Sequence, residues 1–197
     1  MGIGEIGDLL RRSTVQIRGT HPRRASSGSG LIWDRDGTIL TNAHVIGPGP
    51  HTVGHYTVEL WDGRLFPAEI MERDDQRDLA MIRVQTTGLN AAEFRYAPVK
   101  PGELVIAVGN PLGVTGALTT GVVHATGAVD GLGRRVWVQA AIRLAPGNSG
   151  GPLADAAGRV VGMNTMIAMG GLALAVPSAA IADFVRVVQG RSKPEAA

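Results

Sequence analysis

The sequence predicts an all-β fold with two similar halves and one helix near the C-terminus. Short apolar runs recur at roughly 8–12-residue intervals, a spacing that is typical of a β-sandwich or a β-barrel. The 197 residues include 28 Gly and 11 Pro, which suits many tight turns between short strands. Apolar residues make up 44% of the chain, enough to bury a core.

The first elements are a short amphipathic helix, expected at residues 3–12, and a strand at residues 13–18. Val15 and Ile17 alternate with polar neighbours in that strand, as one half-buried side requires. Asp/Gly turns between apolar runs predict three hairpins, at residues 31–40, 58–66 and 151–163. Further strands are expected at residues 80–84, 104–108, 121–125, 136–141 and 172–176.

A helix is expected at residues 177–189. It begins at Pro177-Ser178, ends before Gly190, and has apolar residues at helical spacing: Ile181, Phe184, Val185 and Val188. A polar turn region at residues 98–102 separates the strands into two halves. We therefore predict one domain over residues 1–197, with one half at 13–97, the other at 98–177, and a closing helix at 178–190.

Composition and charge exclude several classes of site. The chain has no Cys, so a disulfide scaffold, a Cys nucleophile and thiolate metal sites are all excluded. A net charge of +2 with scattered basic pairs argues against nucleic-acid binding. No apolar run approaches membrane-span length, and residues 1–18 lack a signal-peptide pattern. The chain as written is expected in the cytoplasm, and outside it in the case of a trimmed leader.

Three short motifs are better explained by turns and surface residues than by ligand binding. The G-x-G-x-x-G at residues 2–7 lacks a preceding strand, and residues 34–37 lack most of a calcium loop. His51 and His55 flank a Pro/Gly-rich loop with no third ligand nearby. We therefore expect no metal and no cofactor.

The segment Gly147-Asn148-Ser149-Gly150-Gly151 places a Ser between small residues, as a nucleophile that receives a carbonyl needs. It fits the G-x-S-x-G elbow of α/β-hydrolases, the nucleophile loop of trypsin-like peptidases, or a plain glycine-rich turn. The elbow requires a His after the Ser, but the last His of the chain is His124. The order of residues therefore excludes the elbow.

Upstream of Ser149 lie a His and an Asp at the ends of predicted strands. His44 follows the first hairpin, and Asp78 stands 34 residues later at the start of a buried strand. Ser149 comes 71 residues after Asp78, which gives the order His, Asp, Ser. This is the chain order of trypsin-like enzymes. Asp74 and Asp75 are alternative candidates for the acid. They lie in a polar loop before the strand, so we expect their carboxylates to be exposed to solvent.

Six segments in order resemble the peptidase domain of the HtrA (DegP-like) serine proteases, over about residues 13–185. They are Ser-Gly-Ser-Gly-Leu-Ile at 27–32, Leu-Thr-Asn-Ala-His-Val at 40–45, Arg-Asp-Leu-Ala at 77–80, Ala-Val-Gly-Asn-Pro-Leu-Gly at 107–113, Pro-Gly-Asn-Ser-Gly-Gly-Pro-Leu at 146–153 and Ala-Val-Pro-Ser at 175–178. The resemblance implies a trypsin-like double β-barrel. The seven residues after Gly190 are too few for the PDZ domain that usually follows in this family.

The resemblance implies a role for each matching residue. His44 is expected to be the general base, Asp78 the acid that orients it, and Ser149 the nucleophile. The oxyanion hole is assigned to Gly147, Asn148 and Ser149, with the N–H groups of Gly147 and Ser149 facing the oxyanion. In trypsin relatives that are activated from a zymogen, an Asp before the nucleophile pairs with the newly cut N-terminal ammonium. Asn148 is uncharged and cannot form this ion pair, so we expect activity without N-terminal cleavage.

The resemblance also assigns substrate binding to Leu172, Ala173 and Leu174, as the strand that pairs with substrate and as part of the P1 pocket. These residues are apolar, and relatives commonly carry an acid where Ala141 stands. We expect cleavage after small or medium aliphatic residues of an extended polypeptide.

The sequence thus predicts a serine endopeptidase, without ATP, metal or cofactor, that hydrolyses unfolded or misfolded proteins in quality control. The family forms trimers, so a homo-oligomer is a further possibility. The alternative is a peptide-binding or chaperone-like module on the same fold that does not hydrolyse its ligand.

Overall fold

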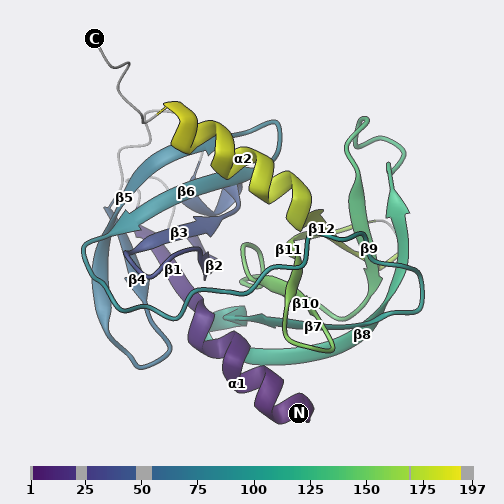
Figure 1. The fold of residues 1–197 in the computed structure, drawn as a ribbon, viewed down its shortest axis with the longest axis horizontal. Helices are drawn as coiled ribbons and strands as arrows, with labels where there is room; N and C mark the ends of the chain where they lie inside the picture. Colours follow the sequence, from purple (N-terminus) through teal and green to yellow (C-terminus); the bar gives the residue numbers. More distant parts are fainter. Residues whose placement is uncertain (1, 21–25, 48–54, 169, 192–197) are drawn as a thin grey trace.

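Two closed, six-stranded antiparallel barrels lie side by side in the computed structural model (Figure 1). The structure describes residues 2–20, 26–47, 55–168 and 170–191. The strand order is β1-β2-β3-β6-β5-β4 in the first barrel and β10-β11-β12-β9-β8-β7 in the second. Each barrel is formed by consecutive strands, so the first half of the chain folds into one barrel and the second half into the other.

The first barrel is closed by pairing between β1 and β4. Its core consists of aliphatic side chains that alternate along the strands, including Val15, Ile17, Val58 and Ile82, all fully buried. Its strands are β1 (Thr14–Thr20), β2 (Ser26–Ile32), β3 (Thr38–Thr41), β4 (His55–Glu59), β5 (Leu65–Asp74) and β6 (Leu79–Val84). A short 3₁₀ helix, η1 (Ala43–Ile46), follows β3 and contains His44.

The second barrel is closed by pairing between β7 and β10. Its core contains Val105, Val138, Ala140 and Leu153, which are again fully or almost fully buried. Its strands are β7 (Leu104–Gly109), β8 (Ala117–Gly127), β9 (Trp137–Ala141), β10 (Pro152–Asp155), β11 (Val160–Ile167) and β12 (Ala173–Pro177). A second 3₁₀ helix, η2 (Pro111–Gly113), connects β7 to β8.

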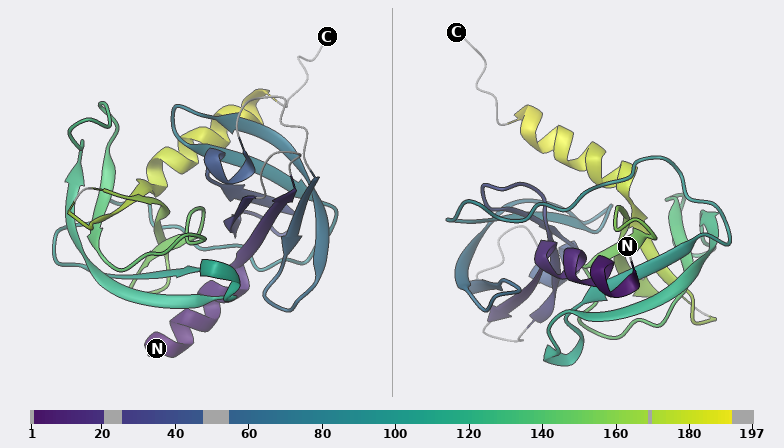
Figure 2. Two further views of the ribbon diagram at one scale, coloured as in Figure 1. Left: turned by 180° about the vertical axis from the view of Figure 1, so that it is seen from behind. Right: turned by 60° about the horizontal axis from the view of Figure 1, so that its bottom comes forward.

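Helix α1 (Ile3–Ser13) precedes the first barrel in the chain but packs against the second. Its buried face carries Ile6 and Leu10, which contact Ile106 and Val108 of β7. Figure 2 shows α1 beside the curved strands of the second barrel. The N-terminal helix therefore ties the two barrels together.

Helix α2 (Ser178–Arg191) lies over the junction of the barrels (Figure 1). Its buried residues Ile181, Phe184, Val185 and Val188 form one cluster with residues of both barrels. The first barrel contributes Leu31, Leu40, Leu79 and Met81, and the second contributes Trp137, Val160, Met163, Leu174 and Val176. Burial of this cluster gives the two barrels a shared apolar core.

The predicted fold class is confirmed: the chain forms two β-barrels and a C-terminal helix. The three predicted hairpins are the pairs β2–β3, β4–β5 and β10–β11. The two predicted helices correspond to α1 and α2, with ends that differ by one or two residues. Among the described residues, no helix is both long enough and apolar enough to cross a bilayer.

Replacing Phe184 by Ala is expected to lower the free energy of unfolding by about 3–5 kcal/mol, because it leaves a cavity between the barrels. Phe184 is 2% exposed, whereas Val187 of the same helix is 43% exposed. Urea denaturation measures the change, with Val187→Ala as the control and an expected effect within about 0.5 kcal/mol. Equal effects of the two variants would contradict a shared core under α2.

Candidate active site

His44 and Asp78 are in direct contact. The Nδ1 atom of His44 lies 3.0 Å from Oδ1 and 2.9 Å from Oδ2 of Asp78. The His44 backbone N–H also donates to Asp78 Oδ1, at 3.1 Å. A carboxylate only accepts hydrogen bonds, so the proton of a neutral His44 ring is on Nδ1 and Nε2 is free to accept one. This is the tautomer that a general base needs.

Asp78 is held in a backbone conformation that few residues adopt. Its φ of +54° lies in the left-handed region, and no other non-glycine residue that the structure describes has a positive φ. The side chain of Asn42, which is fully buried, donates from Nδ2 to the Asp78 carbonyl oxygen at 2.9 Å. Asn42 therefore stabilises the strained turn from which the carboxylate reaches His44.

Ser149 lies on the second barrel and is linked to this pair through Thr165 of β11. The Ser149 hydroxyl donates to the carbonyl oxygen of Thr165 at 2.9 Å, and Asn42 Nδ2 donates to Thr165 Oγ1 at the same distance. Within the described chain, the Ser149 hydroxyl has this one partner. A bond from Ser149 to His44 therefore requires rotation of the Ser149 side chain, a movement common between free and substrate-bound enzymes.

The residues before Ser149 form a β-turn. The backbone N–H of Asn148 donates to the carbonyl oxygen of Ala145 at 3.0 Å, with Pro146 and Gly147 at the corners. Gly147 has a φ of +105°, and an added Cβ would lie 2.5 Å from the Asn110 carbonyl oxygen. A side chain at this position would strain the turn and clash with the backbone of Asn110 and Pro111, just after β7.

The turn determines which N–H groups are available to an oxyanion. The N–H of Asn148 is used within the turn, and its side-chain amide also bonds to Ala145. No described residue accepts a hydrogen bond from the backbone N–H of Gly147 or of Ser149. Of the three residues assigned from the sequence, Gly147 and Ser149 therefore have donors to offer, whereas Asn148 does not.

Leu172, Ala173 and Leu174 lie away from any unpaired strand edge. Ala173 and Leu174 belong to β12, which pairs with β11 on one side and with β9 on the other. Their side chains are almost fully buried in the barrel cores, and Leu172 is half-buried in the loop before them. The backbone of Ala173 and Leu174 is therefore already paired, so these two residues cannot form the strand that pairs with substrate.

The trypsin-like peptidase domain model matches residues 28–163, a span that contains His44, Asp78 and Ser149. The chain belongs to this family. A mitochondrial serine protease HTRA2 of Drosophila pseudoobscura pseudoobscura is 39% identical over 177 residues, and that of Drosophila grimshawi is 37% identical over 178 residues. The alignments cover 87% of this chain and 40% and 41% of those relatives, respectively.

Solved structures of an HtrA-type protease, AlgW, share the fold of this chain. The structure with a tripeptide has a TM-score of 0.88 and 28% identity, and covers 98% of this chain and 65% of that one. The structure with a decapeptide has a TM-score of 0.85 and 26% identity, and covers 96% of this chain and 68% of that one.

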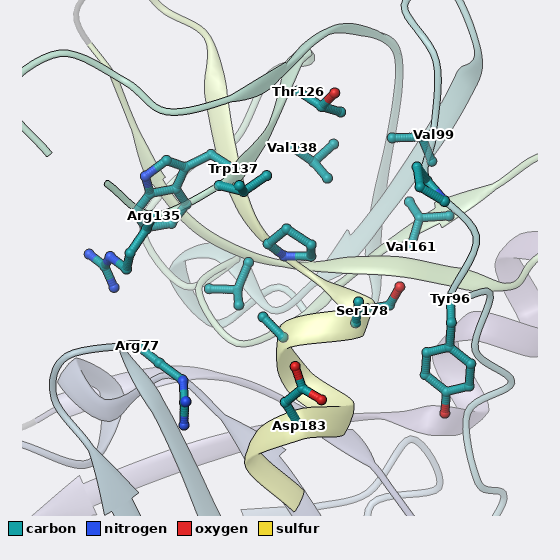
Figure 3. A pocket seen from close by; sticks show the side chains of 16 residues that line it. Arg77, Tyr96, Val99, Thr126, Arg135, Trp137, Val138, Val161, Ser178 and Asp183 are labelled. Atoms are coloured by element: carbon teal, nitrogen blue, oxygen red, sulfur yellow. The ribbon is translucent and has the colours of Figure 1, made fainter. Parts of the chain in front are cut away.

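A cavity of about 490 Å³ lies beside the start of α2. Figure 3 shows Trp137 and Val138 on one side of it, and Arg77 and Asp183 on the other. Its walls are largely apolar, and the described residues that line it include neither His44, Asp78 nor Ser149. The candidate active site therefore lies outside this cavity.

No three His, Cys, Asp or Glu side chains gather as metal ligands in the described part of the chain. His55 begins β4, whereas its predicted neighbour His51 lies outside the described residues. Asp74 bonds to Arg77 and Asp75 bonds to Arg73, so the two competing acids are engaged elsewhere.

Sequence reasoning missed three polar residues of the candidate site: Ser29, Asn42 and Thr165. Ser29 and Asn42 fall within two of the segments that resemble HtrA proteases, but the resemblance implies no role for them. All three are nearly or fully buried, at 0%, 0% and 3% exposure. Ser29 lies between two glycines, and Asn42 and Thr165 each follow another polar residue, so no local pattern distinguishes them from surface positions.

Asp78→Asn is expected to lower kcat for peptide hydrolysis by about 10³–10⁴-fold at neutral pH, because the amide no longer selects the Nδ1-protonated ring. Steady-state kinetics with a peptide substrate measures the change. The matched control is Asp75→Asn, whose carboxylate bonds to Arg73 and is 61% exposed. A larger loss in the control than in Asp78→Asn would contradict the assignment of the acid.

Proposed function

We propose that this chain hydrolyses peptide bonds as a serine endopeptidase. The observation that carries the proposal is the contact of His44 Nδ1 with both carboxylate oxygens of Asp78, at 3.0 and 2.9 Å. Family membership and the HTRA2 and AlgW relatives support the same activity.

The proposed reaction starts when the Ser149 hydroxyl turns from the Thr165 carbonyl toward His44. As Ser149 Oγ attacks the substrate carbonyl, its proton moves to His44 Nε2, and Asp78 stabilises the imidazolium that forms. The N–H groups of Gly147 and Ser149 stabilise the oxyanion. His44 then protonates the leaving amine, and water, activated by the same His44, hydrolyses the acyl-enzyme and restores Ser149.

We infer that the substrate is an extended polypeptide and that β11 pairs with it. Beyond Thr165, β11 pairs with β12 on one edge, and no described strand pairs with residues 165–167 on the other. Met166 and Ile167 are 37% and 52% exposed. The Thr165 carbonyl already contacts the Ser149 hydroxyl, so a strand added at this edge would pass beside the nucleophile.

Substrates with Val or Ala at P1 are expected to show at least about tenfold higher kcat/KM than the same peptide with Arg. Ala141, the position where relatives commonly carry an acid, supplies no charge, and neither does the half-buried Leu172 before β12. Competition assays with a P1 series of otherwise identical peptides measure this preference. Faster cleavage after Arg than after Val would contradict it.

Ser149→Ala is expected to abolish both labelling by a fluorophosphonate and hydrolysis of casein, because it removes the attacking oxygen. The assay uses the chain untrimmed, so labelling of the wild type also tests activity without N-terminal cleavage. Ser27→Ala, at an exposed position of β2, is the matched control and should label like the wild type. A wild type that binds unfolded protein but neither labels nor cleaves would favour the peptide-binding module.

Quality control of unfolded or misfolded protein is the proposed role, and AlgW with bound peptides is the structural parallel. The proposed homo-oligomer, a trimer by resemblance, is tested by light scattering on the purified chain.

Two locations are proposed. The chain as written is expected in the cytoplasm, whereas the names of its relatives give a mitochondrial location. Microscopy of a C-terminally tagged chain in its host separates the two.

A further inference from the structure

Ser29 is a fully buried residue of β2 whose polar atoms all have partners. Its backbone N–H donates to the carbonyl oxygen of Ser149 at 2.8 Å. Its own carbonyl oxygen accepts from the Thr41 hydroxyl at 2.7 Å. Ser29 thus joins the first barrel directly to the nucleophile of the second.

The Ser29 hydroxyl has only one arrangement of its hydrogen bonds. The backbone N–H of Asn110 and the Asn110 Nδ2 both donate to Ser29 Oγ, at 2.9 and 3.1 Å. A hydroxyl has two acceptor positions and one proton, so these donors leave only the proton. That proton is donated to the carbonyl oxygen of Gly147 at 2.7 Å.

Asn110 is itself fixed, which makes the arrangement rigid. Its Nδ2 also donates to the Val15 carbonyl oxygen at 3.0 Å, and its Oδ1 accepts from the Gly116 N–H at 3.0 Å. Asn110 is 2% exposed. Water therefore has little access to replace either residue as a partner of the Gly147 carbonyl.

Ser29 consequently forms hydrogen bonds to the carbonyl oxygens of Gly147 and Ser149, the two residues whose backbone N–H groups are available. The Gly147 carbonyl accepts from its hydroxyl, and the Ser149 carbonyl accepts from its backbone. At Gly150, an added Cβ would lie 2.0 Å from the Ser29 carbonyl oxygen, so the loop lies directly against this residue. Rotation of the Gly147–Asn148 peptide would leave the buried Ser29 hydroxyl without an acceptor, which is unfavourable.

We infer that Ser29 is a positioning residue for the oxyanion hole: it orients the Gly147–Asn148 peptide so that the Gly147 and Ser149 N–H groups face one acceptor. The inference rests on the proposed serine peptidase activity. Because Ser29 acts through the loop, its loss should weaken transition-state binding more than binding of the uncleaved substrate.

The test compares Ser29→Ala with Ser178→Ala. Ser178 is also buried, at 3% exposure, and its hydroxyl also donates to a distant backbone carbonyl, that of Arg95, at 2.5 Å. Ser29→Ala is expected to lower kcat by about 10–100-fold with KM within about twofold, whereas Ser178→Ala keeps kcat within about twofold. Thermal unfolding of both variants identifies any shared loss of stability.

A second measurement separates positioning from substrate binding. The affinity for a peptide boronate, which forms a tetrahedral adduct with Ser149, should fall in Ser29→Ala by the same factor as kcat/KM. Binding of an uncleaved peptide should be equal in Ser149→Ala and in the double variant that adds Ser29→Ala. A wild-type value of kcat in Ser29→Ala would overturn the inference. A loss of peptide binding as large as the loss of kcat/KM would overturn it as well.

Crystal structures of the two Ala variants provide a result that does not depend on turnover. We expect a changed Gly147–Asn148 peptide in Ser29→Ala and an unchanged one in Ser178→Ala. An unchanged peptide in both variants would overturn the role of Ser29. A wild type that fails to label would instead overturn the proposed function, and the peptide orientation would still decide whether Ser29 positions the loop.

Discussion

The candidate site depends on hydrogen bonds that cross from one barrel to the other. His44 and Asp78 belong to the first barrel, and Ser149 belongs to the second. The Ser29 hydroxyl reaches Gly147, and the Asn42 amide reaches Thr165. Catalytic groups tolerate displacements of only about half an ångström, so these contacts must hold the two barrels in one relative position.

Apolar and polar contacts at this junction have different consequences. The cluster under α2 buries side chains of both barrels, and burial of apolar area is largely insensitive to small sliding movements. Ser29 and Asn42 are fully buried, and a buried polar group without its partner costs about 1–3 kcal/mol. The apolar cluster therefore stabilises the docked barrels, whereas the polar contacts select one position.

Two unusual backbone conformations lie at the site, and contacts from other elements hold both. Asp78 has a φ of +54° and is bonded through its carbonyl to Asn42. Gly147 has a φ of +105° and is bonded through its carbonyl to Ser29. The strained conformation of Asp78 persists because its surroundings over-determine it, whereas Gly147 adopts a positive φ without strain. The conformations of Asp78 and of the Gly147 loop therefore depend on contacts in the folded protein and not on their local sequences alone.

The sequence by itself determined the strands, the hairpin turns and α2, because alternation, Asp/Gly turns and helical spacing are local properties. The order of His44, Asp78 and Ser149 also predicted their assignment to a trypsin-like site, and the structure joins the first two directly. Only the tertiary structure decided that β12 has no free edge and that Ser29, Asn42 and Thr165 connect the site. Strand neighbours and inter-barrel contacts form between residues far apart in the chain, where local patterns carry no information.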